Sequence, residues 1–526
     1  MTTTIYSSTL MILIAVAVSN LLAQGFKKIA PTYINLLVGL LVGLLPVMNA
    51  TILSFNNEFF MTAIIAPLLF FEGQNTRVLM VRKKRLLILE TAGSMALALA
   101  IVTGLAVHVI GGIVWPVALI MAAISTPTDA TALDSVTDGR KLPANAGSLL
   151  HLEALFNDAT GLIILQAGVL WYTSGQLALG KKLVAFLWSA GGGLVFGAAI
   201  AFVLMIFRQL LLRSRWNMAS SQIIIYLMTP IVIYLSAEAM AMSGIIAVVS
   251  AGLVYNGEAQ RSRFSNPRQF HLSVQLINFG SEILNSFVFV ILGILLARIV
   301  TGYHPSMTTG HWFWIGLLVY GLGLIGRYIH GLAVKFTSHD AMIFALGGVH
   351  GTVTLALALS VSVLTAADNQ LVLLVETVVI ILSMLVPTVL LPYLLPAKRA
   401  SKLIRPKLTK IREEMVAAGM KQLTNLSLTP AVEASVTYDL RDQLRQTRLR
   451  SFLRQWRQSS WKPETFTGDE ALQERRALMQ AFDAERQYLH ELALSHQIES
   501  NYIYDLYSEI LLAESLVLDP ANQTEV

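Results

Sequence analysis

One strongly apolar stretch of the chain, HLEALFNDATGLI (residues 151–163), contains three polar side chains: Glu153, Asn157 and Asp158. Ionisable groups inside a membrane span are costly, so they mark functional sites by default. Each residue of a helix turns by about 100°, which places Asp158 about 140° away from Glu153 and Asn157 on the Glu153 side. We therefore expect Glu153 to pair with a neighbouring helix and Asp158 to face a cavity.

The chemistry open to Asp158 is the binding of a proton or a small cation in turn. Thr128 and Asp129 lie in a second polar stretch, STPTDATALDSV, where Pro127 frees backbone carbonyls by interrupting the helix. Hydroxyl, carboxylate and carbonyl oxygens are hard ligands that suit an alkali cation. We predict an ion-binding set of Asp158, Asn157, Thr128 and Asp129. We expect an alkali cation to be held at Asp158, Thr128 and Asp129.

Arg327, in GLGLIGRYIHGLAVKF, is the one basic residue that falls well inside a predicted membrane span. An unpaired carboxylate in such a place would take up a proton, whereas a neighbouring guanidinium keeps it ionised. Arg327 is thus the natural partner for Glu153 or for another buried acid, and we predict a buried structural ion pair with Glu153.

The composition divides the chain into two parts. Hydrophobic residues make up 55% of the 526 residues and charged residues 13%, with a mean hydropathy of +0.63. Residues 398–526 nevertheless contain 18 Lys and Arg and 18 Asp and Glu. We predict a membrane domain over 1–397 and a water-soluble, helical, regulatory tail over 398–526, with one helix expected over 429–456.

The elements that must position the polar residues are apolar stretches of membrane-spanning length, roughly 20 residues each. The sequence predicts an all-α polytopic membrane protein with about thirteen spans, at 8–24, 33–48, 58–74, 86–110, 115–136, 146–173, 184–207, 221–241, 243–256, 271–297, 311–334, 341–365 and 370–395. With the N-terminus outside and the tail cytoplasmic, the inward loops carry 16 Lys and Arg and the outward loops 3. This bias obeys the positive-inside rule and supports the count of thirteen spans.

Two of these spans contain helix-breaking residues. The span 115–136 contains Pro127, and the span 341–365 contains three glycines around His350, in GGVHG. They lie seven spans apart, which favours two inverted six-span repeats whose broken helices cross at a central site. His350 has two open roles: packing, or pH modulation, because histidine titrates near neutral pH.

Several motifs resemble the sodium/proton exchangers of the monovalent cation:proton antiporter superfamily, the branch of bacterial NhaP-type proteins and animal sodium/hydrogen exchangers. The resemblance covers about 8–396. It rests on EALFND (Glu153–Asp158) for the family's E-S-L-x-N-D, on Thr128-Asp129 for its T-D-P, on AEAMAMSGIIA (Ala237–Ala247), and on NSFVFVILG (Asn285–Gly293).

The resemblance implies a homodimer in the lipid bilayer that works by alternating access, with Asp158 carrying cation and proton in turn. The expected cation is Na⁺, with K⁺ or Li⁺ as alternatives, and the expected membrane is the plasma membrane, which is the inner membrane of a bacterium. The asparagine before Asp158 implies electroneutral exchange of one cation for one proton, and Arg327 is implied to pair with Glu153. Three positions depart from the family pattern: Ala154 replaces a serine, Ala130 replaces a proline, and His350 stands where an arginine is usual.

Two other classes of function were weighed against a monovalent cation/proton antiporter. A cation channel would more readily show a repeated filter than one acidic residue between two broken helices. An enzyme is disfavoured because the chain has no cysteine and neither an H-E-x-x-H nor a G-x-S-x-G motif. We also expect no cofactor, no disulfide and no nucleic-acid partner.

Overall fold

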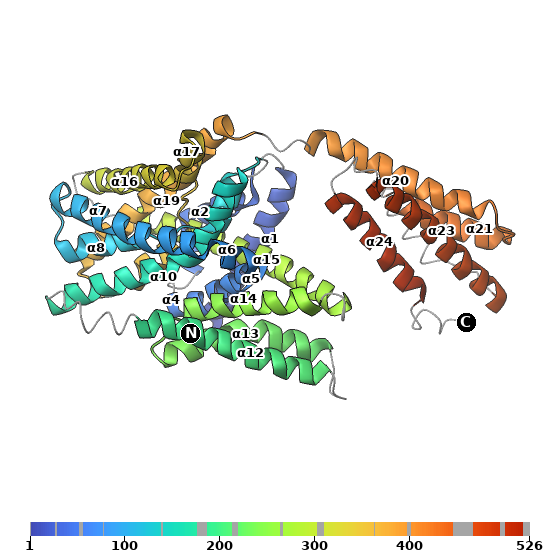
Figure 1. The fold of residues 1–526 in the computed structure, drawn as a ribbon, viewed down its shortest axis with the longest axis horizontal. Helices are drawn as coiled ribbons and strands as arrows, with labels where there is room; N and C mark the ends of the chain where they lie inside the picture. The colour runs from blue at the N-terminus through green and yellow to red at the C-terminus, as the bar shows by residue number, and fades with distance from the viewer. Residues whose placement is uncertain are drawn as a thin grey trace. The chain divides into compact units, whose positions relative to one another are not determined.

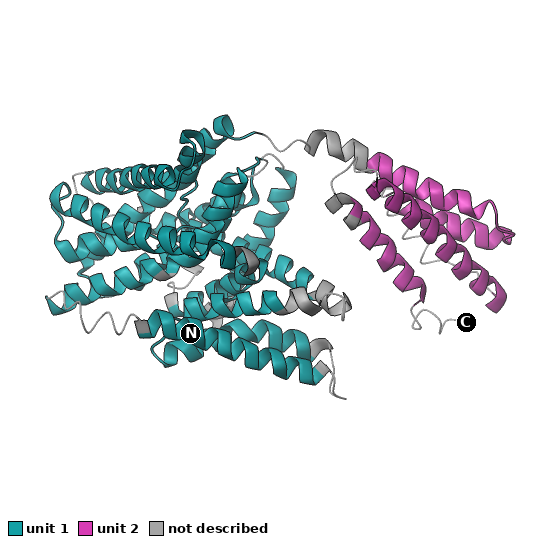
Figure 2. Cartoon of the chain, in the orientation of Figure 1, with its two compact units in different colours: residues 1–397 teal, residues 398–526 magenta. Residues whose placement is uncertain are grey.

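The computed structural model describes residues 2–26, 29–51, 56–76, 78–137, 140–175, 187–212, 219–262, 267–301, 310–361, 363–396, 401–444, 467–494 and 500–518. Every regular element in these residues is a helix. The chain divides into two compact units, residues 1–397 and 398–526 (Figure 2).

The first unit contains the apolar helices (Figure 1). In chain order they are α1 (Thr2–Gly25), α2 (Pro31–Leu44), α3 (Pro46–Thr51), α4 (Asn57–Phe60), η1 (Met61–Ile65), α5 (Ala66–Asn75), α6 (Val78–Ile88), η2 (Leu89–Met95), α7 (Ala96–Val109), α8 (Trp115–Ile124), α9 (Ala130–Val136), α10 (Ala144–Ser174), η3 (Leu187–Gly191), α12 (Gly192–Leu212), α13 (Ala219–Ala239), α14 (Gly244–Ser262), α15 (Pro267–Thr301), α16 (His311–Ala333), α17 (Ser338–Leu346), α18 (Thr352–Ser360) and α19 (Ala366–Leu394).

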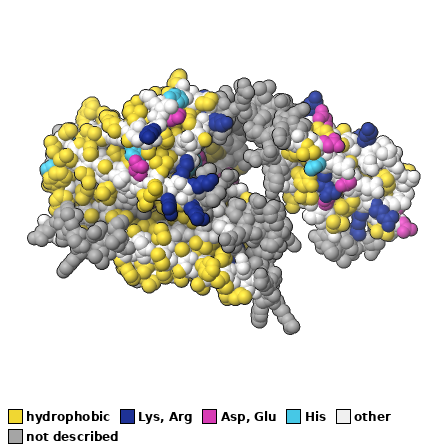
Figure 3. All heavy atoms as spheres, viewed as in Figure 1, with side chains coloured by type: hydrophobic (Ala, Val, Ile, Leu, Met, Phe, Trp, Pro, Cys, Tyr) yellow, Lys and Arg dark blue, Asp and Glu magenta, His cyan; other side chains and the backbone are white. Residues whose placement is uncertain are grey.

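Eight helices in the described residues are long and apolar enough to cross a membrane, and three shorter apolar helices accompany them. Large hydrophobic side chains are exposed along many of these helices, and Figure 3 shows hydrophobic side chains over much of the visible face of this unit. A soluble protein does not expose apolar surface on this scale. The chain is therefore a multi-pass membrane protein, and each of the thirteen predicted ranges contains helix.

Two of the predicted spans are interrupted near their middle. The first breaks at residues 125–129, between α8 and α9, and the second breaks at residues 347–351, between α17 and α18. Proline in the first break cannot donate a helical hydrogen bond, and the glycines of the second lose the most backbone entropy on entering a helix. Each break exposes backbone groups and two new helix ends inside the unit.

Small residues allow several helix pairs to pack with their backbones in contact. A Cβ added to Gly39 of α2 would lie 2.1 Å from the Val290 carbonyl oxygen of α15, and one added to Gly293 of α15 would lie 2.2 Å from the Leu36 carbonyl oxygen. The pair α5 and α14 meets in the same way, where Gly252 faces the Phe70 carbonyl oxygen. Close backbone approach at small residues is the usual means of helix association in membranes.

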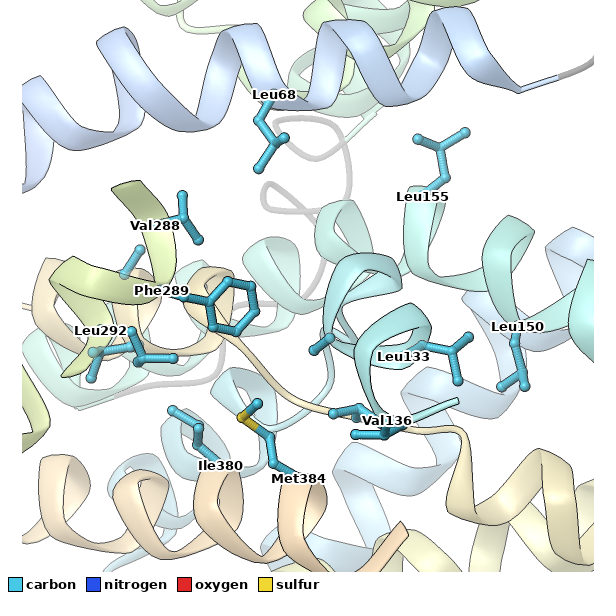
Figure 4. Packing of buried hydrophobic residues seen from close by; sticks show 14 of the residues in the cluster. Leu68, Leu133, Val136, Leu150, Leu155, Val288, Phe289, Leu292, Ile380 and Met384 are labelled. Carbon is cyan, nitrogen blue, oxygen red and sulfur yellow. The ribbon is translucent and has the colours of Figure 1, made fainter. Parts of the chain in front are cut away.

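Several of these helices share one core of buried side chains, which includes Val349 of the second break (Figure 4). It is formed by buried side chains of α5, α9, α10, α15 and α19, among them Leu68, Leu133, Leu150, Phe289 and Met384. Because α9 contributes Leu133 and Val136 to this core, the helix after the first break is held by packing as well as by its cap.

The second unit is a helical bundle of α20 (Ser401–Leu423), α21 (Pro430–Asp442), α23 (Gly468–Leu494) and α24 (Ser500–Leu518). It has a hydrophobic core of its own, which includes Met415, Val436, Phe482 and Ile510. The helix expected over 429–456 is shorter in the structure: α21 ends at Asp442, and residues 443–444 form a turn. Residues 445–456 lie outside the described part of the chain.

Candidate functional site

The two breaks cross each other in direct contact. The Asp129 amide donates a hydrogen bond of 2.8 Å to the Val349 carbonyl, so backbone from one break bonds to backbone from the other. The His350 ring bonds across the same crossing, with Nδ1 2.8 Å from the Pro127 carbonyl oxygen. Segments more than 200 residues apart in the sequence therefore meet at one point.

Asp129 caps helices on both sides of the crossing. Its Oδ1 accepts hydrogen bonds of 2.9 Å from the amides of Thr131 and Ala132, at the start of α9. Its Oδ2 accepts a hydrogen bond of 3.3 Å from the Thr352 amide, at the start of α18. Helix N-termini attract negative charge, so one carboxylate stabilises two half-helices at once.

Asn157 links the first break to α10 by hydrogen bonds. Its Nδ2 donates to the Thr128 Oγ1 at 2.8 Å, and its Oδ1 accepts from the Thr128 amide at 3.4 Å. A third bond of 3.4 Å runs from Nδ2 to the Thr126 carbonyl. In this arrangement the amide uses both of its ends to hold the unwound backbone beside α10.

Asp158 lies in the interior, next to the same break. Its side chain is 3% exposed, and Oδ1 has no hydrogen-bond partner among the described residues. The charges that act on it are those of two other carboxylates, Glu72 and Asp129. Asp158 lines neither of the two cavities described below, and its facing a cavity stays a prediction.

Glu153 and Arg327 form a bidentate ion pair between α10 and α16. Nη1 contacts Oε1, and Nη2 lies 2.9 Å from Oε2. Nη2 also donates to the Phe344 carbonyl at 3.3 Å, and the guanidinium carbon lies 4.6 Å from the Phe344 ring centroid. Both side chains are buried, so the pair is enclosed by protein.

His350 is bonded on two sides of the second break. Its amide donates to the Ser383 Oγ of α19 at 2.9 Å. A carbonyl oxygen only accepts, so the Nδ1 that bonds to Pro127 must carry a proton, which a neutral ring can supply. These bonds fix the ring at the crossing, and the two roles predicted for His350, packing and pH modulation, both stay predictions.

Two cavities flank the crossing. A small one of about 40 Å³ is lined by polar groups that include Ser125, Thr128, Glu153, Arg327 and His350. A larger one of about 400 Å³ is lined by residues of α5, α9, α10 and α15. The rim of the larger cavity contains His151 and Asp134, whose side chains are 43% and 65% exposed and lie 3.0 Å apart.

Glu72 is a member of this site that the sequence analysis missed. It lines the larger cavity and accepts a hydrogen bond of 3.2 Å from the Thr131 hydroxyl. It lies inside the predicted span 58–74, and an acidic residue within an apolar span is the sequence signal that could have identified it. Of the predicted ion-binding residues, the structure brings Thr128 and Asp129 into the crossing and places Asn157 and Asp158 beside it.

The comparisons with known proteins agree on one family. The family model described as "Sodium/hydrogen exchanger, transmembrane" matches residues 10–396. A Bacillus pumilus protein named sodium, potassium, lithium and rubidium/H(+) antiporter is 30% identical over 415 residues, which is 74% of this chain and 61% of that protein. A Bacillus subtilis protein of the same name is 28% identical, over 78% of this chain and 66% of its own length. The chain thus spans less than two thirds of these two relatives.

Two further matches cover nearly the whole of the other protein. An Escherichia coli protein named uncharacterized Na(+)/H(+) exchanger YjcE is 26% identical over 88% of this chain and 90% of its own length. The solved structure of the sodium proton antiporter MjNhaP1 from Methanocaldococcus jannaschii superposes with a TM-score of 0.59 at 18% identity, covering 74% of this chain and 98% of that one. At this identity the structural match supports the fold alone.

Proposed function

The chain belongs to the sodium/hydrogen exchanger family, and from this premise we propose that it is a secondary active antiporter that exchanges a monovalent cation for a proton. Na⁺ is the first candidate cation, with K⁺ and Li⁺ as further candidates. Asp158 is the shared carrier, ionised when it binds the cation and protonated when it does not.

One observation carries this proposal: a buried carboxylate oxygen of Asp158 without a partner, beside two other carboxylates and an unwound helix. Like charges held together away from water repel one another, and a bound cation or proton relieves the repulsion. Thr128 and Asp129 are proposed to contribute oxygens from the crossing, and Asn157 is proposed to hold Thr128 in place.

The test is proton flux in sealed vesicles that contain the purified protein. Addition of Na⁺, K⁺ or Li⁺ to one side should move protons to that side, which neither a channel held at zero voltage nor an enzyme would do. Asp158→Asn keeps the size of the side chain but removes its charge and its proton, so we expect exchange to be lost. Asp340→Asn, an acid-to-amide change at the start of α17, serves as the matched control and should exchange like the wild type.

Exchange is proposed to be electroneutral, because one cation replaces one proton on Asp158. Clamping the membrane potential across the vesicles should then leave the initial rate unchanged. A rate that scales with potential would overturn the one-to-one stoichiometry and would point to Asp129 as a second titrating carboxylate.

The remaining features are proposed at the level of the whole assembly. They comprise thirteen spans in two inverted repeats, a homodimer, alternating access, a plasma-membrane location with the N-terminus outside, and a cytoplasmic tail that regulates exchange. In this topology the larger cavity, with Glu72 and His151, opens toward the cytoplasm.

A further inference from the structure

Glu376 is a fully buried carboxylate that the proposed exchange does not use. It lies on α19 and is 0% exposed. Its two oxygens lie 3.0 and 2.8 Å from the Ser125 Oγ, and Ser125 is the first residue after α8, where the first break begins. A side chain from the last apolar helix is thus bonded to the unwound segment at the crossing.

No described basic group balances a charge on Glu376. The described parts of α8 and α18, which pack against α19, contain no ionisable side chain. Charged side chains from its other neighbours are paired elsewhere or exposed: Arg327 bonds to Glu153, Asp134 lies against His151, Asp340 lies against His339, Arg298 bonds to Asn49, and Glu282 is exposed.

The other titratable side chains on these neighbours include Tyr320, whose phenol is uncharged at neutral pH, and three histidines. His311 bonds to the Gly111 carbonyl, His350 bonds to the Pro127 carbonyl, and His330 lies near the charges of Glu90, Glu153 and Arg327. An isolated buried carboxylate is costly, whereas the neutral acid can both donate and accept hydrogen bonds.

Ser125 connects Glu376 to the small cavity. Its side chain lines that space together with Thr128, His350 and the ion pair of Glu153 and Arg327. The volume of about 40 Å³ is large enough for water, since one molecule needs roughly 10–15 Å³. A serine hydroxyl can accept one proton while it gives up its own, so it can pass a proton between Glu376 and water in the cavity.

We propose that Glu376 and Ser125 form a second proton-binding site in the membrane unit, one that does not compete with the transported cation. On release, the acid proton of Glu376 moves to the Ser125 oxygen as the serine proton moves to cavity water, so one proton leaves and one negative charge stays on Glu376. That charge lies by the carboxyl end of α8, where the helix dipole is also negative. Ionisation of Glu376 therefore acts against the conformation of the break seen here.

The first experiment tests the site itself, without reference to transport. Infrared spectra of the full-length protein in lipid at neutral pH should contain a carboxylic-acid carbonyl band that is lost in Glu376→Gln. Ser125→Ala should shift the same band, because it removes the hydrogen bond. Thr377→Val is the matched control, since it removes a buried hydroxyl of α19 that bonds only to the Leu373 carbonyl, and it should leave the band unchanged.

Absence of any band that depends on Glu376 would show an ionised carboxylate and would overturn the proposal. If Glu376→Gln does not fold, a band unmoved by Ser125→Ala would overturn it in the same way.

The second experiment tests the link to exchange, and it rests on the proposed antiport function. Glu376→Gln is permanently neutral, so the exchange rate in vesicles should lose part of its dependence on pH while the cation concentration for half-maximal rate stays the same. Glu376→Asp, which can still ionise, should restore the pH dependence. A wild-type pH profile in Glu376→Gln would overturn the link. Absence of exchange in the wild type would instead overturn the antiport proposal and leave the infrared test standing.

Discussion

Arg327 uses most of its guanidinium for contacts inside the membrane unit. It bonds to both oxygens of Glu153 and to the Phe344 carbonyl, and it lies over the Phe344 ring. Gly348 makes room for it, because a Cβ at that position would lie 2.4 Å from the arginine Nε. The pair therefore links α10 and α16 to the end of α17 and to the second break itself.

Breaking one partner of this pair should destabilise the protein strongly. Removal of one member of a buried pair typically costs about 3–5 kcal/mol, because the other charge stays behind without compensation. Glu153→Ala and Arg327→Ala should each lower the melting temperature in detergent, and the double variant should lose less than the sum. Glu238→Ala, on α13, is the control and should add to Arg327→Ala. Additive losses for Glu153 and Arg327 would contradict the coupling.

His350 offers a test between its two roles. An asparagine places an N–H near the position of Nδ1 and does not titrate. If His350 has only a packing role at the crossing, His350→Asn should therefore keep exchange and leave the acid side of the pH–rate profile unchanged. His350→Arg should lose exchange, because a second guanidinium would share the small cavity with Arg327. Exchange rates in vesicles across pH provide the measurement. A shifted acid limb in His350→Asn would assign the residue the pH-modulating role instead.

Residue types alone were enough to find most of the site. Charges inside apolar stretches pointed to Glu153, Asp158 and Arg327, and helical geometry separated the side of Glu153 from that of Asp158. Sequence could not show that Asp158 is enclosed, or that Asn157 bonds to Thr128, because both depend on how α10 packs against the first break. Glu72, an acidic residue inside the predicted span 58–74, could have been found by the same criterion, whereas its bond to Thr131 could not.

At the scale of elements, the two broken helices depend on one crowded contact. A Cβ added to Gly351 would lie 2.0 Å from the Asp129 Oδ2, so the backbone of the second break approaches the capping carboxylate as closely as only glycine permits. This single contact therefore holds both the caps of α9 and α18 and the crossing of the two breaks in place.

Gly351→Ala should disrupt this arrangement. The added methyl group would displace the Asp129 carboxylate from the start of α18, and loss of such a cap typically costs about 1 kcal/mol before any effect of the clash. We expect a lower melting temperature and a larger fractional loss of exchange. Gly321→Ala, in the interior of α16 with nothing within 4 Å of its added Cβ, is the control and should be neutral or stabilising. Equal behaviour of the two variants would argue against the crowded contact.

The positions of the breaks could be predicted from Pro127 and the glycines around His350, whereas the hydrogen bonds between the two breaks could not.

The helix packing also supports the proposed repeat. The second predicted span packs on the tenth, as α2 on α15, and the ninth packs on the third, as α14 on α5. In the proposed repeat the second span is equivalent to the ninth and the third to the tenth, so these two packed pairs are equivalent to each other. The sequences of the two halves show no similarity that would have predicted this pattern. Contact between helix backbones needs only small residues at equivalent positions of the two helices.

At the scale of the whole molecule, the tail unit carries its own response to pH. Glu485 of α23 is 0% exposed, and burial raises its pKa to about 8, while a hydrogen bond from Gln443 opposes the rise. Gly419 of α20 packs on this carboxyl group, since an added Cβ would lie 2.9 Å from its Oε1. The folded bundle thus holds a proton that the unfolded chain releases near its ordinary pKa of 4.5.

The stability of the tail should therefore fall as pH rises from about 4.5 to about 8 and level off above that. Thermal unfolding of residues 398–526, which have a core of their own, would measure this slope. Glu485→Gln should flatten it, because the amide stays neutral at every pH. Glu413→Gln, at an exposed position on α20, should keep it. A slope unchanged by Glu485→Gln would contradict the assignment.

The glycine contacts between α2 and α15 have a mechanical consequence. Gly39, Gly43 and Gly293 each place one helix against the backbone or a Cβ of the other at a distance that leaves no clearance for a side chain. Sliding either helix by one residue would drive a methyl group or larger side chain into the opposing backbone, so the pair resists shear along its length. A stiff pair of this kind moves only as one rigid body. It also contacts α9 directly, through the hydrogen bond between the Thr32 and Ser135 hydroxyls and through the core shared by Leu133 and Phe289. In the proposed transport cycle, any displacement of α9 against the pair must therefore break and remake these contacts.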